Sequence, residues 1–137
     1  MFRLAQAFTI SRGSRTEAKV LTVRITMGDL TGWGECVPYA RYGETLDSVE
    51  AQIATLPERL DRAVLAEALA PGAARNAVDC ALWDLEAKRA GKRVWQLAGL
   101  PRPHPEVTAY TLSLDTPEKM QAEAAKNAHR PLLKIKL

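Results

Sequence analysis

Hydrophobic and polar residues alternate along the first forty positions, which predicts β-strands rather than helices. The polar stretch at 11–17 is expected to be a loop, and Gly28-Asp29 is expected to begin a turn. The chain should therefore open with a three-stranded antiparallel meander. Its expected strands lie at residues 3–10, 19–27 and 32–38.

The apolar spacing becomes helical in the middle of the chain, where alanine and leucine dominate. Thr45 is a suitable capping residue for a helix over 46–56. The strongest helical pattern covers 73–90, and Gly91 is well placed to end that helix in a left-handed conformation. A shorter helical piece is expected at 94–98.

A proline-rich linker at 101–105 separates the helical region from a strand, helix, strand pattern. The expected strands are 107–114 and 132–137, and the helix between them begins with Pro117 at its first position. This order is a βαβ unit, which requires parallel strands. Two parallel strands cannot bury both of their faces alone. We therefore expect the chain to be the N-terminal piece of a longer protein.

The composition is that of a globular domain. The 137 residues correspond to about one domain, and 47% hydrophobic with 26% charged residues is close to the average. No apolar stretch approaches the roughly 20 residues needed to span a bilayer, and the N-terminus does not resemble a secretory signal. The net charge of +3 is mild and scattered. We expect a cytoplasmic protein with neither a membrane nor a nucleic acid as partner.

The most reactive pair in the sequence is Lys134 and Lys136, which share one face of the last strand because strand side chains alternate. Neighbouring ammonium groups disfavour each other's charge, and a neutral lysine can take a proton from carbon and return one. By spacing alone, however, a solvent-facing edge strand whose lysines discourage aggregation is the simpler interpretation.

Two further segments suit ligand binding. The guanidinium groups of Arg12 and Arg15 lie in the polar loop and can hold a carboxylate through paired hydrogen bonds. The alternative is an ordinary solvated loop. Glycine, proline and tyrosine residues follow the third expected strand, with Tyr39 and Tyr42 among them, and suit a shaped lid over a ligand. Here the alternative is a plain strand exit with a turn.

Several motifs follow one another in a characteristic order. They are R-G-S-R, G-W-G-E-C-x-P, Y-G-E-T, A-A-R-N-A-V-D-C-A-L-W-D-L, Y-T-L-S and L-K-I-K-L. This order resembles the muconate-lactonizing subgroup of the enolase superfamily, and most closely the L-Ala-D/L-Glu (dipeptide) epimerases. The resemblance covers nearly the whole chain, from about Ser11 to Leu137.

The resemblance implies an α+β fold. Residues 1–105 would be a capping domain, a three-stranded antiparallel meander plus helices, and residues 106–137 would be the first βαβ of a (β/α)7β barrel. Lys136 would be the acid/base catalyst, with Lys134 as its charged companion. The implied substrate-binding residues are Arg15 and Arg12 at the distal carboxylate of a glutamyl residue, Thr111 on the first barrel strand, and Tyr39 and Tyr42 in a second specificity loop.

The implied activity is epimerisation of dipeptides such as L-Ala-D/L-Glu, in which an α-proton is removed and returned through an enediolate stabilised by Mg²⁺. The resemblance places the metal ligands and a second lysine beyond Leu137, with none in this chain, so the chain alone is expected to be inactive. The partner would be a small-molecule dipeptide, and the parent enzyme a homo-oligomer. The alternatives are an N-acylamino acid racemase or cycloisomerase of the same superfamily, or a non-catalytic anion-binding module.

Overall fold

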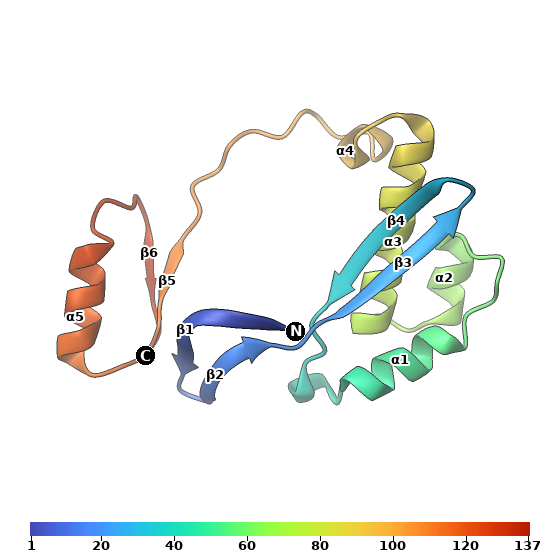
Figure 1. Ribbon diagram of the computed structural model, residues 1–137. Helices are drawn as coiled ribbons and strands as arrows, with labels where there is room; N and C mark the ends of the chain where they lie inside the picture. The colour runs from blue at the N-terminus through green and yellow to red at the C-terminus, as the bar shows by residue number, and fades with distance from the viewer. The chain divides into compact units, whose positions relative to one another are not determined.

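The computed structural model describes residues 1–137, which form two compact units (Figure 1). The terminal unit combines Met1–Ala18 with His104–Leu137, and the central unit is Lys19–Pro103. The terminal unit contains β1 (Phe2–Ile10), β2 (Gly13–Ala18), β5 (Tyr110–Leu112), α5 (Pro117–Lys126) and β6 (Leu133–Ile135). The central unit contains β3 (Leu21–Met27), β4 (Leu30–Cys36), the 3₁₀ turn η1 (Ala40–Tyr42), α1 (Leu46–Ala54), α2 (Arg62–Ala68), α3 (Ala73–Ala90) and α4 (Val94–Leu97). No helix has both the length and the apolar character that crossing a bilayer requires.

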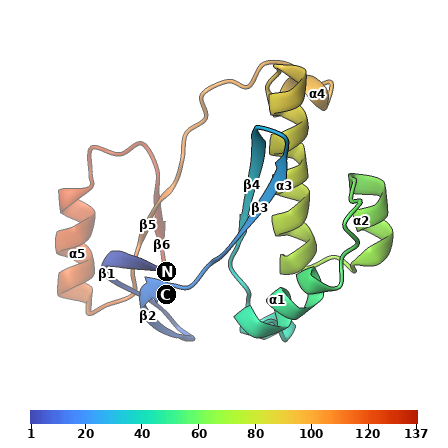
Figure 2. The same cartoon turned by 45° about the vertical axis from the view of Figure 1, so that its right-hand side comes forward.

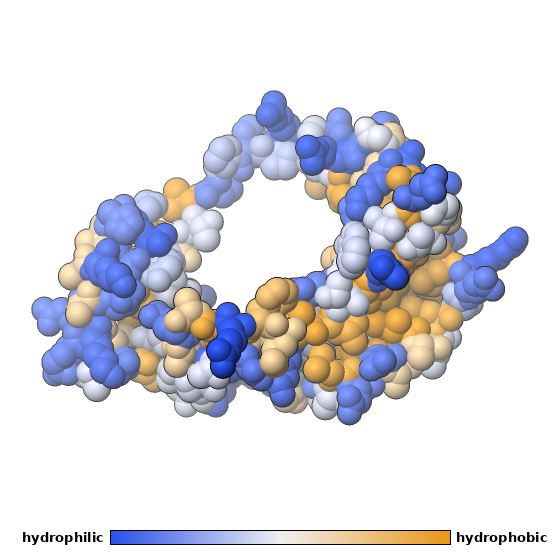
Figure 3. Space-filling model, viewed as in Figure 1, coloured by the Kyte–Doolittle hydropathy of each residue, from blue (hydrophilic) through white to orange (hydrophobic).

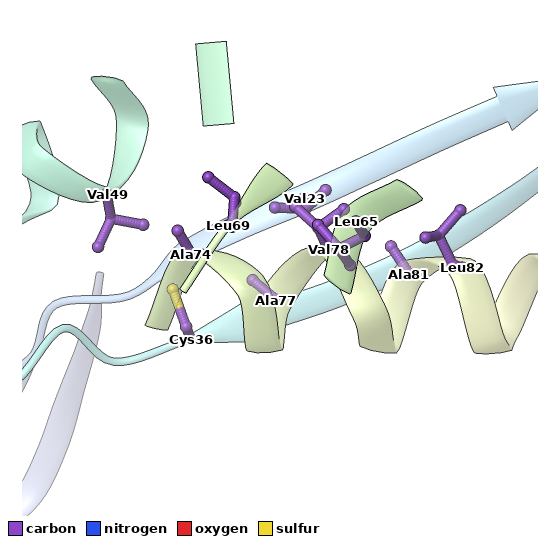
Figure 4. Packing of buried hydrophobic residues seen from close by; sticks show 10 residues of the cluster. All are labelled: Val23, Cys36, Val49, Leu65, Leu69, Ala74, Ala77, Val78, Ala81 and Leu82. Atoms are coloured by element: carbon purple, nitrogen blue, oxygen red, sulfur yellow. The ribbon is translucent and has the colours of Figure 1, made fainter. Parts of the chain in front are cut away.

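The central unit is built around α3. Strands β3 and β4 form an antiparallel hairpin whose register runs from Leu21 opposite Cys36 to Met27 opposite Leu30. Helix α3 lies between this hairpin and α2 (Figure 2). The buried side chains come from all of these elements and from α1 (Figure 4). The core cluster consists of Val23, Cys36, Val49, Leu65, Leu69, Ala74, Ala77, Val78, Ala81 and Leu82.

Strand β4 lies against the backbone of α3 because its inward positions are glycines. A Cβ atom on Gly34 would overlap the carbonyl oxygen of Ala77, and one on Gly32 would overlap the carbonyl oxygen of Ala81. The helix presents only methyl groups at these two buried positions. The hairpin and the helix therefore pack at a distance that no larger residue at position 32 or 34 permits.

Gly34→Ala is expected to destabilise the protein by about 1–3 kcal/mol, because the added methyl group meets backbone atoms that cannot rotate away. Denaturant unfolding of the full-length variant measures the loss. Gly28→Asn is the control, since Gly28 has φ +58 and open space around its Cβ position, a conformation that asparagine tolerates. A Gly34→Ala variant as stable as the wild type would show that α3 can move away from β4 at no cost.

Asp84 and Lys88 of α3 form hydrogen bonds to the backbone of β4. The Asp84 carboxylate accepts the Trp33 backbone N–H at 2.8 Å and the Lys88 ammonium at 2.6 Å. Lys88 also donates to the Thr31 carbonyl oxygen at 2.7 Å. The Lys88 hydrogen bond lowers the pKa of Asp84, partial burial opposes this effect, and the Trp33 N–H adds to the lowering.

Because the pKa of Asp84 is lowered in the folded state, we expect Asp84 to make a contribution to the free energy of unfolding that is lost in acid. The contribution is complete above the ordinary aspartate pKa, near 3.9, and is lost as the pH falls through the lower pKa of the folded state. Asp84→Asn should therefore reduce the thermal unfolding midpoint more at pH 7 than at about pH 3. Asp29→Asn, at an exposed turn position, serves as control. A difference between wild type and Asp84→Asn that does not change with pH would contradict the prediction.

The terminal unit joins a hairpin to a βαβ unit. Strands β1 and β2 are antiparallel, whereas β5 and β6 are parallel and connected through α5, which confirms the predicted βαβ unit. The hairpin is bound to the end of β5, because the Leu114 N–H donates to the Thr9 carbonyl oxygen at 3.0 Å. The Thr9 N–H in turn donates to Ser113 Oγ at 2.7 Å. The outer face of α5 is mostly hydrophilic (Figure 3).

The strand arrangement differs from the predicted three-stranded meander. The first four strands form two separate two-stranded hairpins, and most of the expected loop at 11–17 belongs to β2. The reason is that β2 pairs with β1 while β3 pairs with β4, and the chain passes from one hairpin to the other at Lys19-Val20. Strand β3 accordingly begins at Leu21 rather than at Lys19.

The helices agree better with the prediction. Helix α3 covers Ala73–Ala90 as expected, and Gly91 ends it with φ 61 in the left-handed region. Helix α2 was not predicted, although Asp61 caps it by accepting the Val64 N–H at 2.8 Å. The parallel strands are shorter than predicted, because regular pairing is confined to Tyr110–Leu112 and Leu133–Ile135.

Candidate functional site

The paired strands β5 and β6 bring the two lysines and Thr111 together. In the parallel register Thr111 lies opposite Lys134, and the Lys136 N–H donates to the Leu112 carbonyl oxygen at 3.3 Å. Because side chains alternate along a strand, Lys136 belongs to the same face as Lys134 and Thr111. Lys136 is partly buried and Lys134 is exposed.

The other face of this strand pair carries Tyr110, Leu112 and Ile135 and is partly covered from the side of α5, since Ile135 remains 57% exposed. Leu112 is only 2% exposed. The Arg130 guanidinium lies 4.0 Å from the centre of the Tyr110 ring, and its Nε donates to Asn127 Oδ1 at 2.8 Å. Asn127, itself buried at the end of α5, donates to the Glu123 carbonyl oxygen at 2.9 Å. The lysine face is therefore the one that the helix leaves uncovered.

The predicted carboxylate-binding arginines lie on the β1–β2 hairpin of the same unit. Arg12 occupies the turn between the strands, and Arg15 lies on β2 opposite Phe8, both at exposed positions. The hydrogen bonds of Thr9 attach this hairpin to the residues that follow β5. The structure thus gathers both arginines, Thr111 and both lysines into one compact unit.

Tyr39 and Tyr42 belong instead to the central unit. Tyr39 directly precedes η1 and Tyr42 is its last residue, and their rings pack edge to face with centres 5.6 Å apart and an interplanar angle of 66°. Tyr42 is 75% exposed. The segment is a loop that carries two aromatic side chains, and its expected role over a ligand stays a prediction.

One residue of this loop was missed by the sequence interpretation. The Glu44 carboxylate accepts the Tyr39 N–H at 3.0 Å and the Ala73 N–H at 2.6 Å. The Ala73 bond first, and then the Tyr39 bond, lower the pKa of Glu44, against a smaller opposing effect of burial. Because Ala73 is 29 residues away in the chain, no local spacing identifies the contact.

The residues of this chain do not fit a metal site. No group of three or more histidine, cysteine, aspartate or glutamate side chains in residues 1–137 is placed to hold a metal ion. The Mg²⁺ that the resemblance implies therefore finds no ligand set here.

Residues 2–99 match the family described as mandelate racemase / muconate lactonizing enzyme, N-terminal domain. The chain belongs to this family. The L-Ala-D/L-Glu epimerase of Escherichia coli (strain K12) is 43% identical over 136 residues, which are 95% of this chain and 42% of that enzyme. The N-acetyl-D-glutamate racemase of Pseudoalteromonas sp is 37% identical over 124 residues, which are 86% of this chain and 39% of that enzyme.

A solved structure gives the same assignment. It is an enolase family member from Agrobacterium tumefaciens with homology to dipeptide epimerases, with bound sodium and L-Ala-L-Glu. It is 56% identical with a TM-score of 0.92, over 98% of this chain and 43% of that one. The predicted family is thereby confirmed. The chain spans about two fifths of the length of the relatives it matches.

Proposed function

We propose that the protein containing this chain epimerises dipeptides with a glutamyl residue, such as L-Ala-D/L-Glu, by removing an α-proton and returning it. The observation that carries this proposal is the shared face of Thr111, Lys134 and Lys136, on the side of the β5–β6 pair that α5 leaves uncovered. The family, and the names of the relatives from Escherichia coli and Agrobacterium tumefaciens, supply the substrate class.

The proposed roles follow from the chemistry of an α-proton beside a carboxylate. The lone pair of Lys136 Nζ takes the proton, so the C–H bond breaks, an N–H bond forms, and the electron pair of the C–H bond enters the enediolate of the carboxylate. The Lys134 ammonium stabilises the developing negative charge from the same strand face. Return of a proton from the opposite face completes epimerisation and requires a second acid, which these residues do not provide.

The proposed binding residues lie on the β1–β2 hairpin and in the loop around η1. Arg15, with Arg12 in the adjoining turn, would hold the distal carboxylate of the glutamyl side chain through charge-assisted hydrogen bonds. Tyr39 and Tyr42 would contact the substrate from the second loop. Within this proposal, residues 106–137 begin a (β/α)7β barrel that 1–105 caps, and Mg²⁺ would be held by residues outside 1–137.

The test is an assay of the full-length protein with L-Ala-L-Glu in D₂O, followed by proton NMR. Exchange of the glutamyl α-proton together with appearance of L-Ala-D-Glu supports the proposal, and absence of both overturns it. N-acetyl-D-glutamate is the second substrate to test, because a racemase of that substrate is 37% identical and its substrate shares both carboxylates. Racemisation of N-acetylglutamate without epimerisation of the dipeptide would favour this second function.

A further inference from the structure

The segment Tyr39–Thr45, here called the tyrosine turn, is fixed at its C-terminal end by α1. The Thr45 hydroxyl accepts the Ser48 N–H at 3.0 Å, and the Ser48 hydroxyl oxygen accepts the Thr45 N–H at 2.9 Å. This reciprocal capping box locks the start of α1. Gly43, with φ 73, adopts the left-handed conformation that turns the chain from η1 toward Glu44.

Glu44 fixes the other end of the tyrosine turn. One carboxylate oxygen accepts the N–H of Tyr39, the first residue of the turn, and the other accepts the N–H of Ala73, the first residue of α3. Gly72 leaves the room for this contact, since a Cβ there would lie 3.1 Å from Glu44 Oε1. The single side chain therefore joins the beginning of the turn, its end and the longest helix of the unit.

An ordinary helix cap does not explain this arrangement. The first N–H groups of a helix are usually satisfied by a serine, threonine, aspartate or asparagine directly before it. Helix α3 has Gly72 in that position, with no side-chain cap of its own. The acceptor is instead Glu44 of the tyrosine turn, and its second carboxylate oxygen accepts the Tyr39 N–H. The Glu44 side chain thus holds the tyrosine turn against the first residue of α3.

We propose that Glu44 is a positioning residue for substrate recognition, which holds Tyr39 and Tyr42 in a preformed arrangement by clasping the tyrosine turn to the N-terminus of α3. This inference rests on the proposed function. The edge-to-face packing of the two rings and the 75% exposure of Tyr42 fit side chains that are presented rather than buried. A preformed contact element spares the substrate the entropic cost of ordering it.

The experiment is a double-mutant cycle in the full-length enzyme with L-Ala-L-Glu as substrate. Glu44→Gln keeps the size of the side chain but loses the charge and one of the two acceptor oxygens. We expect it to raise KM about 5- to 10-fold and to change kcat less than 2-fold, since the clasp acts on binding. In a background that carries both Tyr39→Ala and Tyr42→Ala, the same substitution should have almost no further effect on KM, because Glu44 acts through these two side chains.

Two further measurements separate this role from simple stabilisation. Amide hydrogen exchange should accelerate in 39–45 of Glu44→Gln and stay unchanged in the control Glu50→Gln, which alters an exposed glutamate of α1. If the wild type epimerises L-Ala-L-Glu but Glu44→Gln keeps the wild-type KM, or if its effect simply adds to that of the combined Tyr39→Ala and Tyr42→Ala substitutions, the inference is wrong. If the wild type leaves L-Ala-L-Glu unchanged, the proposed function itself fails.

Discussion

Lys136→Ala is expected to lower the rate of epimerisation by about 10²- to 10⁴-fold, the usual contribution of a positioned proton-transfer group. The physical reason is its position. Lys136 is partly buried on the face that α5 leaves uncovered, beside Lys134 and Thr111, and its backbone N–H is bonded to β5. Alanine leaves that backbone hydrogen bond intact and removes the side chain beyond Cβ, including Nζ, so the loss reports the role of this side chain.

Deuterium incorporation measured by NMR, starting from each epimer separately, checks this prediction. Exchange should stop for the epimer whose α-proton faces Lys136. Lys134→Ala should reduce the rate by a smaller factor, because Lys134 supplies charge rather than the proton. Lys92→Ala, an exposed lysine after α3, should change nothing. If Lys136→Ala still exchanges both epimers at the wild-type rate, β6 is only a strand that carries two lysines.

Helix α3 could be predicted because its sequence signals are local. The apolar spacing of α3 and the stop at Gly91 lie within one segment, and α3 has the predicted bounds. Strand pairing is not local in the same way. The residues of β2 are mostly polar and exposed, so their pattern is typical of a loop until the partner strand β1 is known. The three-stranded meander was wrong for that reason.

In the candidate site, too, the local features could be predicted from the sequence and the contacts between distant segments could not. The alternation of Lys134 and Lys136 is visible in the sequence, whereas the register that places Thr111 opposite Lys134 depends on a parallel pairing that spans α5. The aromatic loop was predicted from its glycine, proline and tyrosine residues. Its clasp by Glu44 was not, because the acceptor and the Ala73 donor become neighbours only when α3 packs in place.

Arg15→Ala is expected to reduce kcat/KM for L-Ala-L-Glu by roughly 10- to 150-fold, which corresponds to the 1.5–3 kcal/mol of a charge-assisted hydrogen bond. The same substitution should have little effect on L-Ala-L-Gln, which has the same shape without the negative charge. Arg15 lies on β2 opposite Phe8, in a hairpin held to the end of β5 through Thr9. Its guanidinium therefore belongs to the same unit as the lysine face.

Steady-state kinetics with both dipeptides separate charge recognition from loop shape. Arg12→Ala is the matched control, because Arg12 lies in the turn of the same hairpin, and its loss should be smaller. Arg15→Lys should recover part of the preference for the acidic dipeptide, since the charge returns without the paired geometry of a guanidinium. Equal losses for L-Ala-L-Glu and L-Ala-L-Gln would mean that Arg15 shapes the hairpin and does not bind the distal carboxylate. The substrate class would then have to be sought among dipeptides without an acidic side chain.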